Sequence, residues 1–464
     1  MWAIRSEGPT ATEEVTVTAQ AWRRWAAGAV LLVGVLVAGF GGCDIIDPDL
    51  PQDEAVARSD LPREAEPNVS DDVIETLAAD NAQLAFTLLA AIRTIQHEDE
   101  RDENLFFSPH SISAALAMAY VGARGTTELQ MKDALRFSLE QEMVHPAFNA
   151  LDLALAGRAE AESPYEGDGF RLNIVNAVWG QTGYPFQDPY LDVLAEHYGA
   201  GMRLLDFITE PETARATIND WVWKQTEERI ENLLPQGSIN IDTRLVLTNA
   251  VYFNAPWLRP FDPELTEPES FTTHAGEETT VQMMRQTASL GYAEWEGGQA
   301  VELPYNGATL SMVILLPHSG GFNAFEQALT QEIYAGIVSR IESRQVHLIL
   351  PRFSYTTQLS LVPPLASLGM AEAFVPGAAD FSGIDGTRSL YISDVIHQAF
   401  VAVDEAGTEA AAATAVLFER TAISGPPVTV AVNRPFLFAI RDLPTGEILF
   451  VGRVIDPTPL VVSE

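Results

Sequence analysis

The segment GTEAAAATAVLFERTA, residues 407–422, constrains the fold of this chain more than any other stretch. Alanine runs such as Ala410–Ala413 usually favour a helix, but in a strand the residues alternate between two faces. One face then carries Thr408, Ala410, Ala412 and Thr414. Small side chains there allow a strand to enter between packed neighbours, because bulky or charged ones would clash or be buried unpaired. Gly407 is predicted to act as a hinge, because glycine tolerates large changes in φ and ψ.

The rest of the chain mixes helical and strand patterns. Apolar residues recur at helical spacing in Leu77–Ile95, and Ser111–Val121 is predicted to be a second, buried helix. Short apolar runs bounded by turn residues predict buried strands, and the final stretch alternates around a Pro-Thr-Gly turn, as a hairpin does. The predicted strands are Arg244–Phe253, Leu310–Pro317 and Gln345–Pro351. Helices and strands do not alternate regularly, so the predicted class is α+β.

The N-terminal segment predicts export. Arg23 and Arg24 precede an uncharged run that ends in Gly41-Gly42-Cys43, and this pattern resembles a bacterial lipoprotein signal, whose cysteine is acylated and becomes the mature N-terminus. An uncleaved membrane anchor and an ordinary cleaved signal are the alternatives, and all three export the remainder. The predicted divisions are an export signal at residues 1–43, a solvated, acidic, proline-containing tether at 44–72 and a single domain at 73–460. That domain is expected outside the cell or at its surface, attached to the membrane only through the N-terminus.

Composition narrows the function. The net charge of −37, from 64 Asp and Glu against 27 Lys and Arg, repels phosphate backbones and argues against a nucleic acid partner. The single cysteine, Cys43, excludes an intramolecular disulfide and a Cys-based zinc site. The sequence has no GxSxG, P-loop or HExxH motif, and no two of its eight histidines have metal-ligand spacing along a helix. We therefore predict no enzyme, metal or cofactor, although a catalytic triad assembled from distant positions stays open.

Several blocks of the chain, taken together, resemble the serpins, the serine protease inhibitor superfamily. The segment DEAGTEAAAATAV, residues 404–416, is similar to the serpin hinge, with Ala406 where a charged residue is common. The block NRPFLFAIRDLPTGEILFVGRVIDP is similar to the family's C-terminal signature. The others follow in the family's order: Asn104–Met131, Ile218–Pro235, Leu245–Trp257 and Leu390–Thr414.

The resemblance implies a fold of three β-sheets with eight or nine helices and an exposed reactive loop at about residues 405–424. It also implies a mechanism. The target protease cleaves the loop, is held as an acyl-enzyme and is dragged across the molecule while the loop inserts as a new strand of the central sheet. A monomeric inhibitor of serine-type endopeptidases is therefore expected. The alternative is a non-inhibitory serpin-fold binding module, against which the small hinge residues argue.

The resemblance also places the reactive bond. Counting fourteen residues on from Gly407, as inhibitory members of the family do, reaches Thr421, so the bond is expected at Thr421–Ala422. A threonine suits a protease with a small S1 pocket, such as an elastase- or subtilisin-like enzyme. Cleavage at Arg420–Thr421 would suit trypsin-like enzymes. Both bonds, and a cysteine protease as the target, stay open.

Other family positions carry over residue by residue. The hinge positions are Glu405, Gly407, Thr408, Ala410, Ala412 and Thr414. Four residues match a polar cluster beneath the central sheet, where its strands part: Ser108, Ser111, Asn249 and His397. Trp257 matches the aromatic residue near the point where the loop first enters the sheet. We expect Thr408 to be exposed before cleavage and to be the first inward residue that enters.

Overall fold

The computed structural model describes residues 55–96, 103–159, 171–408 and 426–458, which lie within one compact unit. Their elements confirm the predicted α+β class, since strands and helices follow no regular alternation. All three predicted strands are present, as β5, β9 and β10, and the predicted C-terminal hairpin is formed by β15 and β16. The predicted lipidation site, Cys43, lies outside the described residues.

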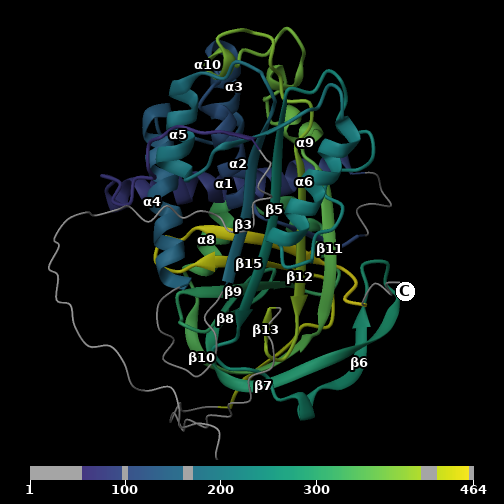
Figure 1. Cartoon of the computed structure of the whole chain (residues 1–464). Helices are drawn as coiled ribbons and strands as arrows, with labels where there is room; N and C mark the ends of the chain where they lie inside the picture. The colour runs from purple at the N-terminus through teal and green to yellow at the C-terminus, as the bar shows by residue number, and fades with distance from the viewer. Residues whose placement is uncertain (1–54, 97–102, 160–170, 409–425, 459–464) are drawn as a thin grey trace, which may run out of the picture. The chain divides into compact units, whose positions relative to one another are not determined.

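The central sheet has the strand order β1-β4-β3-β5-β13-β12-β11. In Figure 1 its long strands run side by side, and the short β13 lies near their lower end. β5 is buried along almost its whole length, as its continuous apolar sequence predicts. The strands are β1 (Ala55–Ala57), β4 (Met202–Leu205), β3 (Arg171–Gln181), β5 (Leu245–Pro256), β13 (Gly407–Thr408), β12 (Ile396–Val403) and β11 (Phe353–Ser360).

The second sheet follows the order β14-β10-β7-β8-β9-β15-β16-β2, and β6 pairs with β7 off this path. β7 pairs with β6 and β10 over its first part and with β8 at its end. The resemblance implies three sheets. The described part of the chain contains two, because β7 joins the strands that pair with it into one sheet. The strands are β2 (Leu105–Phe107), β6 (Glu267–Thr272), β7 (Glu278–Trp295), β8 (Gly298–Pro304), β9 (Leu310–Pro317), β10 (Glu342–Pro351), β14 (Val428–Ala431), β15 (Phe436–Asp442) and β16 (Ile448–Val454).

The described part of the chain contains ten α-helices, and the count exceeds the implied eight or nine because it includes the short α9 and α10. Both predicted helices are confirmed, as α1 and α2. No helix among the described residues is long and apolar enough to cross a membrane. The helices are α1 (Asp71–Ile95), α2 (Pro109–Tyr120), α3 (Gly125–Ala134), α4 (Gln141–Ala159), α5 (Asp188–Tyr198), α6 (Pro211–Gln225), α7 (Phe322–Ala328), α8 (Gln331–Val338), α9 (Val362–Ser367) and α10 (Ser382–Asp385).

Two helices cover the two faces of the central sheet. α2 packs against β3 and β5 and is buried along almost its whole length, and Ser108 caps its start by accepting the N–H of Ser111. α6 crosses the other face, in front of the sheet in Figure 1, where Ile218 and Val222 pack in a cluster with Trp179. A strand that enters between β5 and β12 therefore passes between two packed layers.

Part of the predicted tether packs against the body of the protein. Ala55–Ala57 form β1, which pairs antiparallel with the edge strand β4. Arg63 Nε donates to Asn149 Oδ1 at 2.8 Å, and the N–H of Glu64 donates to the carbonyl of Glu196 at 2.9 Å. The expectation of a solvated tether over residues 44–72 is therefore wrong for residues 55–64, which pair with β4 or bond to the helices beside it. An edge strand offers unpaired N–H and C=O groups, which an acidic segment can pair with as well as any other.

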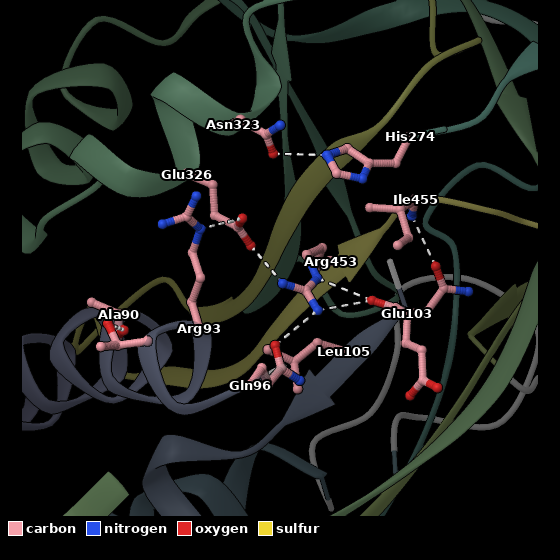
Figure 2. Close-up of polar contacts among 12 residues, drawn as sticks. Ala90, Arg93, Gln96, Glu103, Leu105, His274, Asn323, Glu326, Arg453 and Ile455 are labelled. Atoms are coloured by element: carbon pink, nitrogen blue, oxygen red, sulfur yellow. Dashed lines mark hydrogen bonds and ion pairs between the residues drawn. The ribbon is translucent and has the colours of Figure 1, made fainter. Parts of the chain in front are cut away.

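Arg453 on β16 is a buried charge with partners on both sides of its guanidinium group (Figure 2). Its Nη1 donates to Glu326 Oε1 on α7 at 3.0 Å, and its Nε and Nη2 donate to the carbonyl of Glu103 at 3.1 and 2.9 Å. Arg93, near the end of α1, donates to the other oxygen of Glu326 at 3.1 Å. Buried charges need such pairing, so this network ties α1, α7 and the C-terminal strand together.

Replacing Arg453 by methionine should lower the free energy of unfolding by about 3–5 kcal/mol, because the change leaves the buried Glu326 carboxylate without one of its two cations. Arg344→Met is the matched control. Arg344 pairs with Glu342 on the surface, where the two side chains are 58% and 71% exposed, and such a pair contributes about 1 kcal/mol or less. Denaturant unfolding followed by circular dichroism measures both effects. Equal, small effects would contradict a structural role for the buried network.

Candidate functional site

The candidate site lies between β5 and β12. At one end of this pair of strands, β13 separates them: Gly407 and Thr408 pair antiparallel with Pro256 and Ala255 of β5, and Thr408 also pairs with Val403 of β12. At the other end the two strands pair directly and in parallel, Ile396–Ala399 with Thr248–Val251. The hinge segment therefore already starts a new strand in the uncleaved chain. The predicted hinge residues Ala410, Ala412 and Thr414 and the predicted reactive bonds at Arg420, Thr421 and Ala422 lie outside the described residues.

A tight turn over residues 404–407 connects β12 to β13. The N–H of Asp404 donates to the carbonyl of Gly407 at 2.9 Å. In the other direction, Asp404 Oδ1 accepts the N–H groups of Ala406 and Gly407 at 2.8 and 3.1 Å. Burial raises the pKa of Asp404, although these two N–H groups act to lower it. The turn is thus held from within by one carboxylate.

Neighbouring elements hold the same turn from outside. Trp257, just after β5, donates its backbone N–H to the carbonyl of Ala406 at 2.9 Å and its indole N–H to the carbonyl of Asp404 at 3.0 Å. Arg352 Nε donates to Glu405 Oε1 at 2.7 Å, and Thr266 Oγ1 donates to the same oxygen. Burial acts to raise the pKa of Glu405, but these hydrogen bonds hold it below its ordinary value. The predicted positions Glu405 and Trp257 therefore meet at the turn.

Gly407 is required for a reason that the sequence does not reveal. A Cβ atom at this position would lie 2.2 Å from the carbonyl oxygen of Ala255 and 2.6 Å from Pro256 Cα. Both are backbone atoms, which cannot move aside as a flexible side chain would. Gly407 is not among the described glycines with a positive φ. Close approach of two backbones, rather than an unusual conformation, therefore demands glycine in the uncleaved chain.

Thr408 is buried, and the expectation that it is exposed before cleavage is wrong. It is 1% exposed, and its Oγ1 lies 2.8 Å from the hydroxyl oxygen of Tyr305. Tyr305 stacks on Trp257 with ring centroids 4.6 Å apart. Burial raises the pKa of Tyr305, so its hydroxyl keeps its proton. Thr408 is therefore already part of the sheet, because it pairs with both strands and its hydroxyl group has a partner there.

The predicted polar cluster is assembled at the closed end of the site. Asn249 on β5 and His397 on β12 are paired residues of the two strands, and a hydrogen bond joins His397 Nδ1 to Asn249 Oδ1. Asn249 Nδ2 donates to Ser111 Oγ at 2.7 Å and to Asn176 Oδ1 at 2.6 Å. The N–H of Ser108 donates to His397 Nε2 at 3.2 Å. The cluster bonds α2 to the line along which β5 and β12 pair.

These contacts decide the proton on His397. Its Nε2 accepts from a backbone N–H and its Nδ1 faces an amide oxygen, so the neutral ring with the proton on Nδ1 satisfies both partners. Burial lowers the pKa of His397 to about 3. A second proton would sit on Nε2 and break the bond from Ser108. His397, predicted as a member of the polar cluster, thus makes a hydrogen bond across the two strands.

Five residues of the site escaped the sequence analysis: Asn176, Tyr305, Arg352, Thr266 and Asp404. Asn176 carries a usable signal, because it is the one polar residue in the run Ile174–Trp179 of β3. Tyr305, Arg352 and Thr266 follow β8, β10 and a short 3-10 helix, and nothing in the local pattern separates them from ordinary turn residues. The described residues contain no group of three or more His, Cys, Asp or Glu that could hold a metal ion.

Proteins of known sequence match most of this chain. Residues 79–457 match the family model described as Serpin (serine protease inhibitor). An uncharacterized serpin-like protein of Thermococcus kodakarensis is 38% identical over 442 residues, which cover 92% of this chain and 98% of that protein. The leukocyte elastase inhibitor of Sus scrofa is 38% identical over 393 residues, which cover 83% of this chain and 100% of that protein.

Two solved structures share the fold. The native state of the thermophilic serpin tengpin gives a TM-score of 0.73 at 28% identity, covering 87% of this chain and 99% of that one. Uncleaved ovalbumin gives a TM-score of 0.72 at 27% identity, covering 82% of this chain and 100% of that one. The fold that the resemblance implies is therefore confirmed.

The buried His397 should make the protein less stable in mild acid. Its pKa falls from 6.5 to about 3 on folding, so between these values the unfolded chain binds a proton that the folded chain excludes. The free energy of unfolding should therefore rise by up to about 1.4 kcal/mol per pH unit from pH 3 to 6.5 on account of this residue, and level off above. Urea unfolding at several pH values, for wild type and His397→Gln, measures the slope. Equal slopes in the two proteins would contradict this account.

Proposed function

Since this chain belongs to the serpin family, we propose that it inhibits serine-type endopeptidases and traps them by inserting its cleaved loop between β5 and β12. The observation that carries the proposal is the position of Thr408, which pairs with both strands where an inserting strand would begin. The inward positions that follow, Ala410, Ala412 and Thr414, are all small. A bulky or charged residue at any of them would block the advance of the strand.

The energetics fit a trap that is released by cleavage. A strand that inserts fully adds a dozen or so ladder hydrogen bonds at about 0.5–1.5 kcal/mol each, on the order of 10 kcal/mol in all. This is comparable with the whole stability of a typical domain, roughly 5–15 kcal/mol. The uncleaved form is then held kinetically, by the direct pairing of β5 with β12 and by the polar cluster around His397 and Asn249. Cleavage frees one end of the loop and lets the strand advance.

The proposed target is an elastase- or subtilisin-like protease. Thr421 at the expected reactive bond suits a small S1 pocket, and a relative with 38% identity is named leukocyte elastase inhibitor. Cleavage at Arg420–Thr421 by a trypsin-like enzyme is the alternative. We also propose that the protein acts as a monomer outside the cell, attached through an acylated Cys43. An anchor of this kind would concentrate the inhibitor at the cell surface, although stable attachment needs more than one acyl chain.

Incubation with a panel of proteases tests the proposed activity. We expect a complex with an elastase- or subtilisin-like enzyme that survives boiling in SDS, and a released C-terminal peptide that begins at Ala422. Mass spectrometry identifies that peptide. A peptide beginning at Thr421, with tight inhibition of trypsin, would move the reactive bond to Arg420. Cleavage of the loop by every protease, with no stable complex, would favour a non-inhibitory binding module and overturn the proposal.

Thr408→Arg should turn the inhibitor into a substrate. The guanidinium group cannot be buried unpaired beside Tyr305, so Gly407 and Thr408 should leave the sheet while the fold persists. Insertion races against hydrolysis of the acyl-enzyme, and a barrier higher by about 1.4 kcal/mol shifts the outcome tenfold. Thr408→Ser, which keeps the hydroxyl group and the small size, is the control. Complex formed per loop cleaved is the measurement, and equal yields for Arg, Ser and wild type would show that insertion is not the inhibitory step.

A further inference from the structure

The chain reversal between β12 and β13 is built before any cleavage occurs. Residues 404–407 form a hydrogen-bonded turn, and the residues on either side of it, Val403 and Thr408, are paired across the two strands. Within the described residues, the geometry is that of a short hairpin whose second strand is β13. Every later residue of the loop can then add to the end of a strand that already exists.

The rate at which the strand grows depends on whether this turn is in place between β5 and β12. Only molecules in which Gly407 and Thr408 lie between β5 and β12 can add the next residue, so the rate of insertion is proportional to the fraction of molecules with the turn in place. The partners outside the turn, Trp257 and Arg352, fix where it lies. They do not close it, because neither bonds to the N–H groups of Ala406 and Gly407.

Asp404 is the residue that closes the turn. Its Oδ1 accepts both of those N–H groups, at 2.8 and 3.1 Å, and its own N–H donates to the carbonyl of Gly407. The carboxylate therefore bridges the two residues that must reverse direction at the point where Gly407 presses against the backbone of Ala255 and Pro256. No other side chain among the described residues accepts a hydrogen bond from these two N–H groups.

We propose that Asp404 is a positioning residue for loop insertion, which keeps the turn closed and so holds Thr408 seated as the growing end of the new strand. This inference rests on the proposed function, because it names the residue that sets the speed of the proposed trapping step. The role is attributed to the position of the Asp404 side-chain oxygen as a hydrogen-bond acceptor, and not to the negative charge of the carboxylate. Three variants separate these two properties.

Asp404→Asn keeps an oxygen acceptor at the same distance and removes the charge. Asp404→Glu keeps the charge and moves the carboxylate one methylene away. Asp404→Ala removes both. We expect the Asn variant to insert its loop within about twofold of the wild-type rate, because Asn and Asp serve almost equally as acceptors for backbone N–H groups. We expect the Ala and Glu variants to insert roughly 5- to 150-fold more slowly, the range for the loss of two ordinary hydrogen bonds.

The main measurement is the number of inhibitor molecules consumed for each protease trapped, read beside the rate of the first attack on the loop. Slower insertion should raise the number consumed for Ala and Glu and leave the rate of attack unchanged, because the scissile bond is not altered. A merely structural defect would lower the thermal stability of the uncleaved protein without moving this ratio. If Ala and wild type consume the same number, or if Asn behaves like Ala while Glu behaves like wild type, the inference is wrong.

A second measurement keeps the two proposals apart. Trp257 donates its indole N–H to the carbonyl of Asp404, so the fluorescence change after loop cleavage follows insertion without any need for trapping. Insertion that is fast in wild type and slow in Asp404→Ala, with no protease trapped, would overturn the proposed function and support the role of Asp404. Equal insertion rates in the two proteins would overturn the role of Asp404 alone. No insertion in wild type would overturn both.

Discussion

The direct pairing of β5 with β12 is the interaction on which the rest of the structure depends. Ile396–Ala399 and Thr248–Val251 bond in parallel, and α2 and α6 pack over the two faces of the sheet that contains them. While this pairing lasts, no further strand can enter. The bond between His397 and Asn249 strengthens the pairing at a single position, and Ser108 and Ser111 link that position to α2. These side chains therefore hold β5 and β12 together at the position where the two strands pair.

The opposite end of the same two strands is already parted. β13 occupies the gap there, and in the described part of the chain Tyr252–Asn254 of β5 pair with β3 and have no partner on the β12 side. β13 thus parts the two strands at one end, and the bond between His397 and Asn249 joins them at the other. In the proposed insertion, extension of β13 needs only small side chains and a fixed starting point. The bond between His397 and Asn249 must break before the new strand can pass. In the proposed mechanism, cleavage frees one end of the loop and so allows that advance.

The fold class, the main helices and strands and the polar cluster of the site follow from sequence. Periodicity predicts α1, α2, β5, β9 and β10, because each has one dominant apolar pattern, and family resemblance brings Ser108, Ser111, Asn249 and His397 to one place. Burial of Thr408 could not be predicted, since it depends on how far β5 and β12 happen to be parted. Asn176 and Tyr305 join the site through contacts between segments far apart in the chain. The sequence does not predict the pairing of Ala55–Ala57 with β4. An acidic, proline-containing composition indicates a solvated segment, and it carries no information about a free sheet edge elsewhere in the chain.

Thermal unfolding before and after cleavage of the loop tests the central claim most directly. The loop is cut with a protease that is not trapped, the protease is removed, and the melting temperature is compared with that of the uncut protein. If the cut loop enters between β5 and β12, a gain on the order of 10 kcal/mol should raise the melting temperature by on the order of 20 °C. An unchanged or lower melting temperature, as for an ordinary nicked loop, would contradict the account.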